Sequence, residues 1–158
     1  MSDTTAKLLW NGDLRFIGIN ANGSETAIDG DHQAAPSPVE LLLEATASCS
    51  AVDVVLILAK MRTPAARLEI DIDADRRPTP PRYVTRLRLA FDIWGDGITA
   101  EKAARAIQLS VVKYCSVFNT LRLDLKLELD FRLHATGAEG DGEYQSIQLD
   151  HGVNDDHD

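Results

Sequence analysis

The amino-acid sequence predicts an α+β fold with mainly antiparallel sheet. Two observations point to this class: the elements follow one another in the order strands, helix, strands, helix, strand, and hairpin turns join neighbouring strands. The chain has 158 residues, which is long enough for one domain with a substantial core.

The chain begins with a predicted hairpin at residues 6–20. Its apolar side chains alternate with period two on both sides of Asn11-Gly12, a pair that tolerates positive φ. A short strand at residues 25–28 follows a second turn at Asn22-Gly23. The N-terminal part is therefore expected to be antiparallel sheet.

A long apolar helix is predicted at residues 37–62. Ser37 can cap it, Pro38 suits its first position, and Glu40 can close a capping box. The helix has little polar surface, so it should be covered on most sides, and a chain of this size would struggle to enclose it. A second subunit would solve that problem.

The remaining elements follow from simple periodicities. Two strands are expected at residues 67–75 and 82–94, and Thr99 caps a second amphipathic helix that reaches Tyr114. Residues 121–133 alternate strictly between apolar and charged side chains, which outweighs the helix preference of leucine and predicts a strand.

Charge is unevenly distributed. The chain carries 25 acidic and 16 basic residues, a net charge of −9, which argues against nucleic acid and anionic membranes as partners. The Gly-rich residues 135–158 carry a net charge of −7. We expect them to be a disordered acidic tail that follows a domain of residues 1–134. With no uninterrupted apolar run of about 20 residues and no secretory pattern in residues 1–13, we expect a cytoplasmic protein that does not span a membrane.

Cys49 and Cys115 are the only cysteines. Without a CxxC motif or an extracellular signal they predict neither a disulfide framework nor a zinc site. Each either fills space as a small apolar side chain or reacts as a thiol. Residues 116–121 suggest a short helical turn whose first amides would favour a thiolate at Cys115. Asp53, four residues after Cys49, is either its polar neighbour or an exposed or capping carboxylate.

Several motifs together resemble one family. The runs SPVELLLEATASC, AVDVV and KMR, the motif KYCSV 66 residues after Cys49, and the opening WNGDL resemble the OsmC/Ohr family, named for osmotically induced and organic-hydroperoxide-resistance proteins. The resemblance covers residues 7–134. It implies an OsmC-like fold and an intertwined homodimer, with the long helices and the active sites at the shared interface.

The resemblance also implies roles for the two thiols. In hydroperoxide-reducing members the first cysteine, here Cys49, attacks the peroxide as a thiolate and becomes a sulfenic acid. The second, here Cys115, condenses with it to a disulfide, which an external dithiol reduces. No cofactor or metal takes part.

These members hold the reactive thiolate with an arginine that a glutamate at the helix start orients. Glu40 either corresponds to that glutamate or only closes the capping box. Residues 16–59 contain no Lys or Arg, so the cation must be Arg15, Lys113 or none, and without one Cys49 should react slowly.

Three hypotheses about function remain. The first is a thiol-dependent peroxidase for organic hydroperoxides, acting as a homodimer with a dithiol reductant. The alternative is a non-catalytic dimeric module that binds an apolar ligand or senses oxidants. In the third, the cysteines are purely structural.

Overall fold

A computed structural model describes residues 4–149 of the protein. The fold is α+β with mainly antiparallel sheet, as predicted. Its elements in chain order are β1 (Ala6–Trp10), β2 (Arg15–Asn20), β3 (Glu25–Asp29), α1 (Pro38–Lys60), β4 (Arg67–Arg76), β5 (Val84–Trp94), α2 (Ala100–Leu109), the π-helical turn η1 (Ser110–Tyr114), the 3-10 turn η2 (Phe118–Thr120), β6 (Lys126–His134) and β7 (Gln145–Ile147). The chain divides after Glu44 into two compact units.

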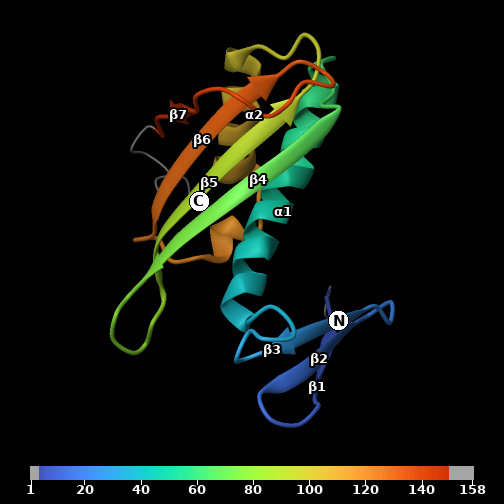
Figure 1. Ribbon diagram of the computed structural model, residues 1–158, viewed down its shortest axis with the longest axis vertical. Coiled ribbons are helices and arrows are strands. Elements are labelled where there is room, and N and C mark those ends of the chain that lie inside the picture. The colour runs from blue at the N-terminus through green and yellow to red at the C-terminus, as the bar shows by residue number, and fades with distance from the viewer. Residues whose placement is uncertain (1–3, 150–158) are drawn as a thin grey trace, which may run out of the picture. The chain divides into compact units, whose positions relative to one another are not determined.

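The first unit contains a three-stranded antiparallel sheet in the order β1-β2-β3 (Figure 1). The predicted hairpin is present, with Trp10 paired to Phe16. Its loop is longer than a two-residue turn because Asp13 joins Gly12 in the left-handed region, with φ of 46° and 85°. The Trp10 indole N–H donates to the Asp13 carbonyl oxygen at 2.9 Å and fixes this loop.

Helix α1 begins as the capping box predicts. The Ser37 N–H donates to Glu40 Oε2 at 2.7 Å, and the Glu40 N–H donates to Ser37 Oγ at 3.4 Å. The helix ends at Lys60, two residues earlier than expected, because Arg62 adopts a φ of 59°. Among the helices of residues 4–149, α1 is the one long and apolar enough to cross a membrane.

Only a narrow stripe of α1 is buried. Its members recur at spacings of three and four residues, and they are Thr46, Ala47, Ser50, Val54 and Leu58. Large apolar side chains elsewhere on the helix are exposed, including Val52 at 59% and Leu56 at 52%. The single chain therefore does not cover this helix on most sides.

The second unit is built on a four-stranded sheet in the order β4-β5-β6-β7. Strand β5 pairs antiparallel with β4 and parallel with β6, and β7 pairs antiparallel with β6. The part of α1 that belongs to this unit and α2 both lie behind the sheet (Figure 1). Alternate apolar side chains of β5 form the centre of the core without any exposed surface, and they are Leu87, Leu89, Phe91 and Ile93.

Two predicted elements differ in extent. The second helix is α-helical only to Leu109 and continues as the π-helical turn η1, which ends where the Cys115 N–H donates to the Ser110 carbonyl oxygen at 2.7 Å. Strand β6 begins at Lys126 rather than at residue 121, because its pairing with β5 begins at Arg86 opposite Lys126. The alternation of residues 121–125 therefore continues beyond the sheet.

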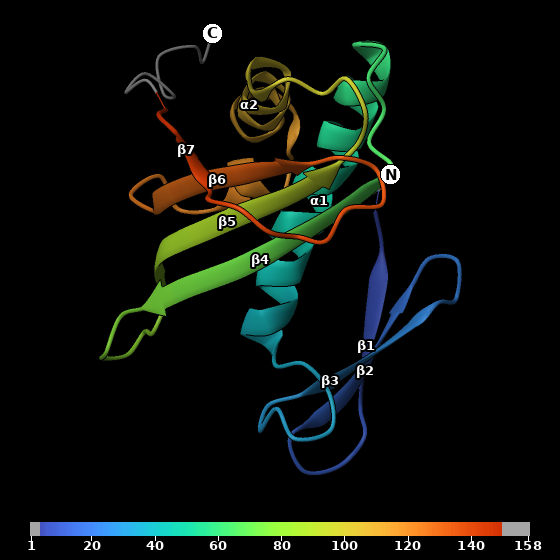
Figure 2. The same ribbon diagram turned by 45° about the horizontal axis from the view of Figure 1, so that its top comes forward.

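Residues 135–149 are ordered, against the expectation from composition. Figure 2 shows this segment leaving β6, crossing the face of the sheet away from α2, and returning as β7. The Trp94 indole N–H donates to the Ala138 carbonyl oxygen at 2.8 Å, and the Tyr144 hydroxyl donates to Asp92 Oδ2 at 2.7 Å. The rest of the expected tail, residues 150–158, lies outside the described residues.

Candidate functional site

The two cysteines, far apart in sequence, come together in the second unit. Cys49 lies in the middle of α1 and is half-buried, whereas Cys115 follows η1 and has no exposed surface. The Cys115 thiol donates a long hydrogen bond to the Thr46 carbonyl oxygen, with sulfur and oxygen 3.9 Å apart. Burial raises the pKa of Cys115 most, and the neighbouring Cys49 thiol raises it further. The structure thus makes neighbours of the two predicted site thiols.

The sequence-based expectation of a low-pKa thiol at Cys115 is wrong, although the turn that suggested it exists. The Phe118 N–H lies 3.3 Å from Cys115 Sγ and donates to it. Complete burial outweighs this donor, so the pKa of Cys115 is raised. Lys113 offers no evident compensation: it is exposed, and its Nζ lies 5.5 Å from the centre of the Tyr114 ring.

Polar groups line the junction between α1 and η1. The Ser110 hydroxyl, which is fully buried, lies 3.1 Å from the Ser50 carbonyl oxygen and 3.2 Å from Asp53 Oδ2, and its one O–H proton is shared between these two acceptors. Asp53 is therefore neither a fully exposed carboxylate nor a helix cap, because it receives a hydrogen bond from the second helical segment. The Ser50 hydroxyl is buried and has no partner of good geometry among the described residues, although it is near enough to Cys115 to favour its thiolate.

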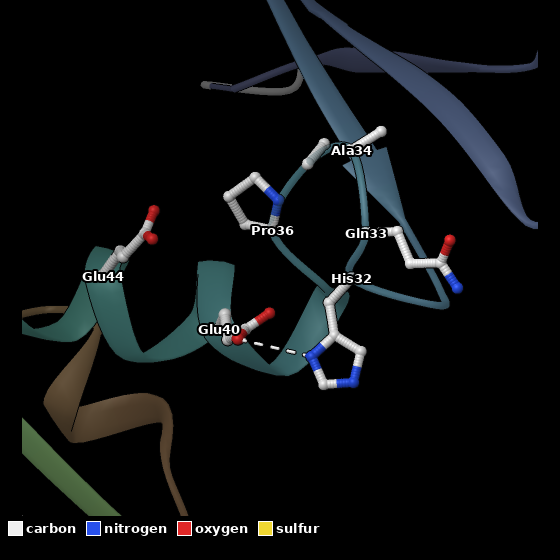
Figure 3. Close-up of a pocket in the computed structure, with 7 residues that line it drawn as sticks. His32, Gln33, Ala34, Pro36, Glu40 and Glu44 are labelled. Carbon is white, nitrogen blue, oxygen red and sulfur yellow. Dashed lines mark ion pairs between the residues drawn. The ribbon is translucent and has the colours of Figure 1, made fainter.

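Glu40, the third predicted site residue, belongs to the first unit. Figure 3 shows its carboxylate facing His32, with Oε1 3.6 Å from the ring Nδ1. Hydrogen bonds from Ser37, with a smaller contribution from His32, hold the pKa of Glu40 below its usual range. These are the contacts of a helix cap. Glu40 and His32 also line a cavity of about 380 Å³, together with Gln33, Ala34, Ala35, Pro36 and Glu44.

The loop that forms this cavity depends on a residue that the sequence analysis missed. The buried Asp29 carboxylate accepts the N–H groups of Asp31, Gln33 and Ala34 at 3.0, 3.2 and 3.0 Å. The bonds from Ala34 and Asp31 do most to lower the pKa of Asp29, and the charge of Arg15 adds a small effect. Arg15, one of the two cations considered for Cys49, is therefore an exposed side chain whose charge acts on Asp29.

The sequence analysis also missed Ser110. Its signal was a polar residue within the apolar stripe of the second helix, next to the two valines that precede Lys113. As for metals, no group of three or more His, Cys, Asp or Glu side chains in residues 4–149 is arranged to hold an ion.

The chain is similar to known proteins in sequence and in fold. Residues 30–130 match the sequence profile of the OsmC-like proteins. Protein YhfA of Escherichia coli K12 is 40% identical over 113 residues, which make up 71% of this chain and 84% of YhfA.

Solved structures share the fold. A protein of Aquifex aeolicus VF5 superposes with a TM-score of 0.77 at 25% identity, over 85% of this chain and 98% of its own. An organic hydroperoxide resistance protein of Elizabethkingia anophelis superposes with a TM-score of 0.64 at 15% identity, over 85% and 98% of the two chains. Because the profile alone covers well over half of the sequence, the chain belongs to the family of OsmC-like proteins.

Proposed function

We propose that the protein is a thiol-dependent peroxidase that reduces organic hydroperoxides, with Cys49 as the reactive thiol and Cys115 as the resolving thiol. The observation that carries the proposal is the proximity of these two thiols across α1 and η1, because a cycle that closes a disulfide requires it. Membership of the OsmC-like family and the fold shared with an organic hydroperoxide resistance protein support the same class of reaction.

The division of roles follows from exposure. Cys49 is half-buried and can meet a substrate, whereas Cys115 has no exposed surface and can meet only its neighbours. The many apolar side chains of α1 suit an alkyl or aryl peroxide better than a small polar one.

The proposed cycle consists of peroxide reduction, disulfide closure and reduction of the disulfide. The Cys49 thiolate attacks the terminal oxygen of the peroxide, the O–O bond breaks, and the alkoxide takes a proton and leaves as an alcohol, so Cys49 becomes a sulfenic acid. Cys115 then attacks the Cys49 sulfur, a disulfide forms, and the hydroxyl leaves as water. An external dithiol reduces that disulfide by two successive exchanges and becomes a disulfide itself.

Glu40 contributes to this proposal through the helix that carries Cys49. The hydrogen bond that it accepts from the Ser37 N–H fixes the start of α1, and the His32 ring lies beside it. We assign Glu40 this positioning role. Residues 16–59 contain no Lys or Arg, so Glu40 has no arginine from this segment to orient toward Cys49. The Glu40–His32 pair therefore contributes to the helix cap alone.

We further propose that the protein works as a homodimer in the cytoplasm. The exposed Val52 and Leu56 lie four residues apart on one side of α1, and a second copy of the helix would cover them. A cycle that a dithiol restores needs a reducing compartment, which the cytoplasm provides.

The test uses the reduced protein and cumene hydroperoxide. Peroxide loss and thiol loss are followed together, and mass spectrometry locates the bond that forms. We expect one Cys49–Cys115 disulfide per turnover, no turnover in Cys49→Ser, and a Cys49 sulfenic acid that persists in Cys115→Ser. Equal peroxide consumption by the parent and Cys49→Ser would refute the proposal.

One observation favours a second candidate, a non-catalytic dimeric module that senses oxidants slowly or binds an apolar ligand. The segment before Cys49 lacks a basic residue, and burial raises the pKa of Cys115, so both thiols would react slowly. Under this hypothesis cumene hydroperoxide oxidises the protein no faster than it oxidises a free small-molecule thiol.

A further inference from the structure

The Ser50 hydroxyl is the least explained polar group near the cysteines. The residue has no exposed surface, and its Oγ has no partner of good hydrogen-bonding geometry among residues 4–149. A buried hydroxyl without a partner costs free energy, and alanine would avoid that cost while favouring the helix. A role in another state of the site would account for a hydroxyl here.

Helix geometry brings this hydroxyl to the Cys115 sulfur. That sulfur lies 3.9 Å from the carbonyl oxygen of Thr46, four residues before Ser50 and on the same buried stripe. Side chains in a helix tilt toward its N-terminus, so the Ser50 side chain leans over the turn that carries Thr46. Ser110, which donates to the Ser50 carbonyl oxygen at 3.1 Å, holds the two segments together at this point.

The groups around Cys115 favour opposite protonation states. The Thr46 carbonyl oxygen accepts the S–H proton and therefore favours the thiol. The Phe118 N–H, 3.3 Å from the sulfur, donates and therefore favours the thiolate. A serine hydroxyl can also donate, and a thiolate would give it the acceptor that it lacks in the reduced protein.

Few charged groups face this sulfur. From α1 the titratable neighbour is the Cys49 thiol, whereas the Asp53 carboxylate accepts from the Ser110 hydroxyl. From η1, Lys113 is exposed and lies over the Tyr114 ring. From η2 no titratable side chain is present, because its residues are Phe, Asn and Thr.

We propose that Ser50 is a positioning residue for disulfide closure, whose hydroxyl donates to the Cys115 sulfur as that sulfur loses its proton and attacks Cys49. The inference rests on the cysteine pair of the proposed function, but it concerns only the second step. In that step the Cys115 thiol gives its proton to solvent, and the electron pair of its sulfur forms the bond to the Cys49 sulfur. The bond between the Cys49 sulfur and its attached group breaks, and the hydroxyl of a sulfenic acid takes up a proton and leaves as water.

An aromatic disulfide such as dithiobis(nitrobenzoate) isolates this step without any peroxide. The reagent forms a mixed disulfide with the accessible Cys49 and releases one coloured nitrothiobenzoate. Cys115 then attacks the Cys49 sulfur, which closes the protein disulfide and expels a second nitrothiobenzoate. In stopped-flow measurements over a range of pH, the first phase reports Cys49 and the second reports the protonation state of Cys115.

We expect Ser50→Ala to move the pH midpoint of the second phase upward by about one unit, since one donor to the thiolate is lost. The rate of that phase at neutral pH should fall roughly three- to tenfold, because the lower thiolate fraction is partly offset by a more basic nucleophile. The first phase should keep its rate. The matched control is Ser48→Ala, whose exposed hydroxyl donates to the Ala45 carbonyl oxygen at 3.2 Å and should leave both phases unchanged.

An unchanged midpoint of the second phase in Ser50→Ala would overturn the inference. A fall in rate without a shift of the midpoint would also overturn it, because that result indicates a packing effect. If the midpoint shifts while the parent fails to consume cumene hydroperoxide, the peroxidase proposal fails and the role of Ser50 stands. Ser50→Ala should melt no lower than the parent, so a folding defect would not mimic the result.

Discussion

The buried carboxylate of Asp92 should be the strongest single anchor of the second unit. Its side chain is 7% exposed and receives four hydrogen bonds. Two come from the Arg132 guanidinium, one from the Tyr144 hydroxyl at 2.7 Å, and one from His134 Nε2 at 2.7 Å. Because an ionised carboxylate only accepts, His134 carries its proton on Nε2. Asp92→Asn keeps the shape of the side chain and removes its charge.

The cost of Asp92→Asn can be bounded from this geometry. Removing one partner of a buried ion pair typically costs about 3–5 kcal/mol. Arg132 is 23% exposed and recovers part of its hydration, so the lower limit of about 3 kcal/mol applies. Whole domains are stable by roughly 5–15 kcal/mol, so the variant should still fold. With a urea slope of about 2 kcal/mol per molar, the unfolding midpoint should fall by about 1.5 M.

The cost should also depend on pH. Burial raises the pKa of Asp92, but the bonds from Arg132, His134 and Tyr144 outweigh burial and hold that pKa below its usual range. A carboxyl group with a depressed folded-state pKa stabilises the protein fully above its unfolded-state pKa of about 4, and this contribution disappears as the pH falls through the folded-state value. The difference between parent and Asp92→Asn should therefore be constant from neutral pH to about pH 5 and shrink below pH 4.

The matched control is Asp73→Asn on the same face of the sheet. Its carboxylate is 61% exposed and lies 3.1 Å from an Arg88 nitrogen, and exposed ion pairs contribute little. Equal shifts of the urea midpoint in the two variants would refute the reasoning, because burial would then not decide the strength of the contact. A difference between parent and Asp92→Asn that persists undiminished at pH 3 would refute the assignment to the ionised carboxylate.

Three further predictions concern other parts of the chain. Leu56→Glu should convert a dimer into monomers by charging the exposed face of α1, and sedimentation would show the change, whereas the same mass for both proteins would contradict the proposed interface. Glu40→Gln should keep both the capping box and the peroxide turnover, while Glu40→Ala should lower the melting temperature; a loss of turnover in Glu40→Gln alone would show that the charge itself is needed. Ser110→Ala should cost about 1 kcal/mol by removing the hydrogen bonds to Ser50 and Asp53, and a melting temperature equal to that of the parent would show that these bonds add nothing.

Local patterns were sufficient to predict most of the fold. The capping box at Ser37 and Glu40 is a contact between residues three apart, so the sequence contains both partners. The same holds for the Thr99 cap and for the hairpin turn at Gly12. Where a prediction depended on a distant partner it was less accurate, as at residue 121, where alternation continues but the pairing with β5 does not.

The segment after His134 shows why composition was misleading. Its glycines and acidic side chains make folding costly in entropy, and the prediction of a disordered tail rested on that cost. The compensating contacts come from Asp92 and Trp94, more than 40 positions earlier, which bind Tyr144 and Ala138. No local pattern marks such contacts, so residues 135–149 could be placed only by the structure.

The site was predicted through a family resemblance rather than through periodicity. Periodicity alone did not decide whether each cysteine is a space-filling side chain or a reactive thiol. The resemblance selected Cys49 and Cys115 together, and the structure makes them neighbours. The sequence does not reveal how deeply Cys115 is buried, and burial decides its pKa.

That raised pKa is consistent with the proposed cycle. A resolving thiol that stays protonated at rest does not compete for peroxide, and it avoids the irreversible oxidation to which an exposed thiolate is prone. The neighbouring Cys49 thiol contributes to the raised pKa of Cys115 because two adjacent thiolates would repel each other. Once Cys49 carries a neutral sulfenic acid, that repulsion is gone, and Cys115 loses its proton more easily. The oxidation of Cys49 should therefore itself promote the step that resolves it.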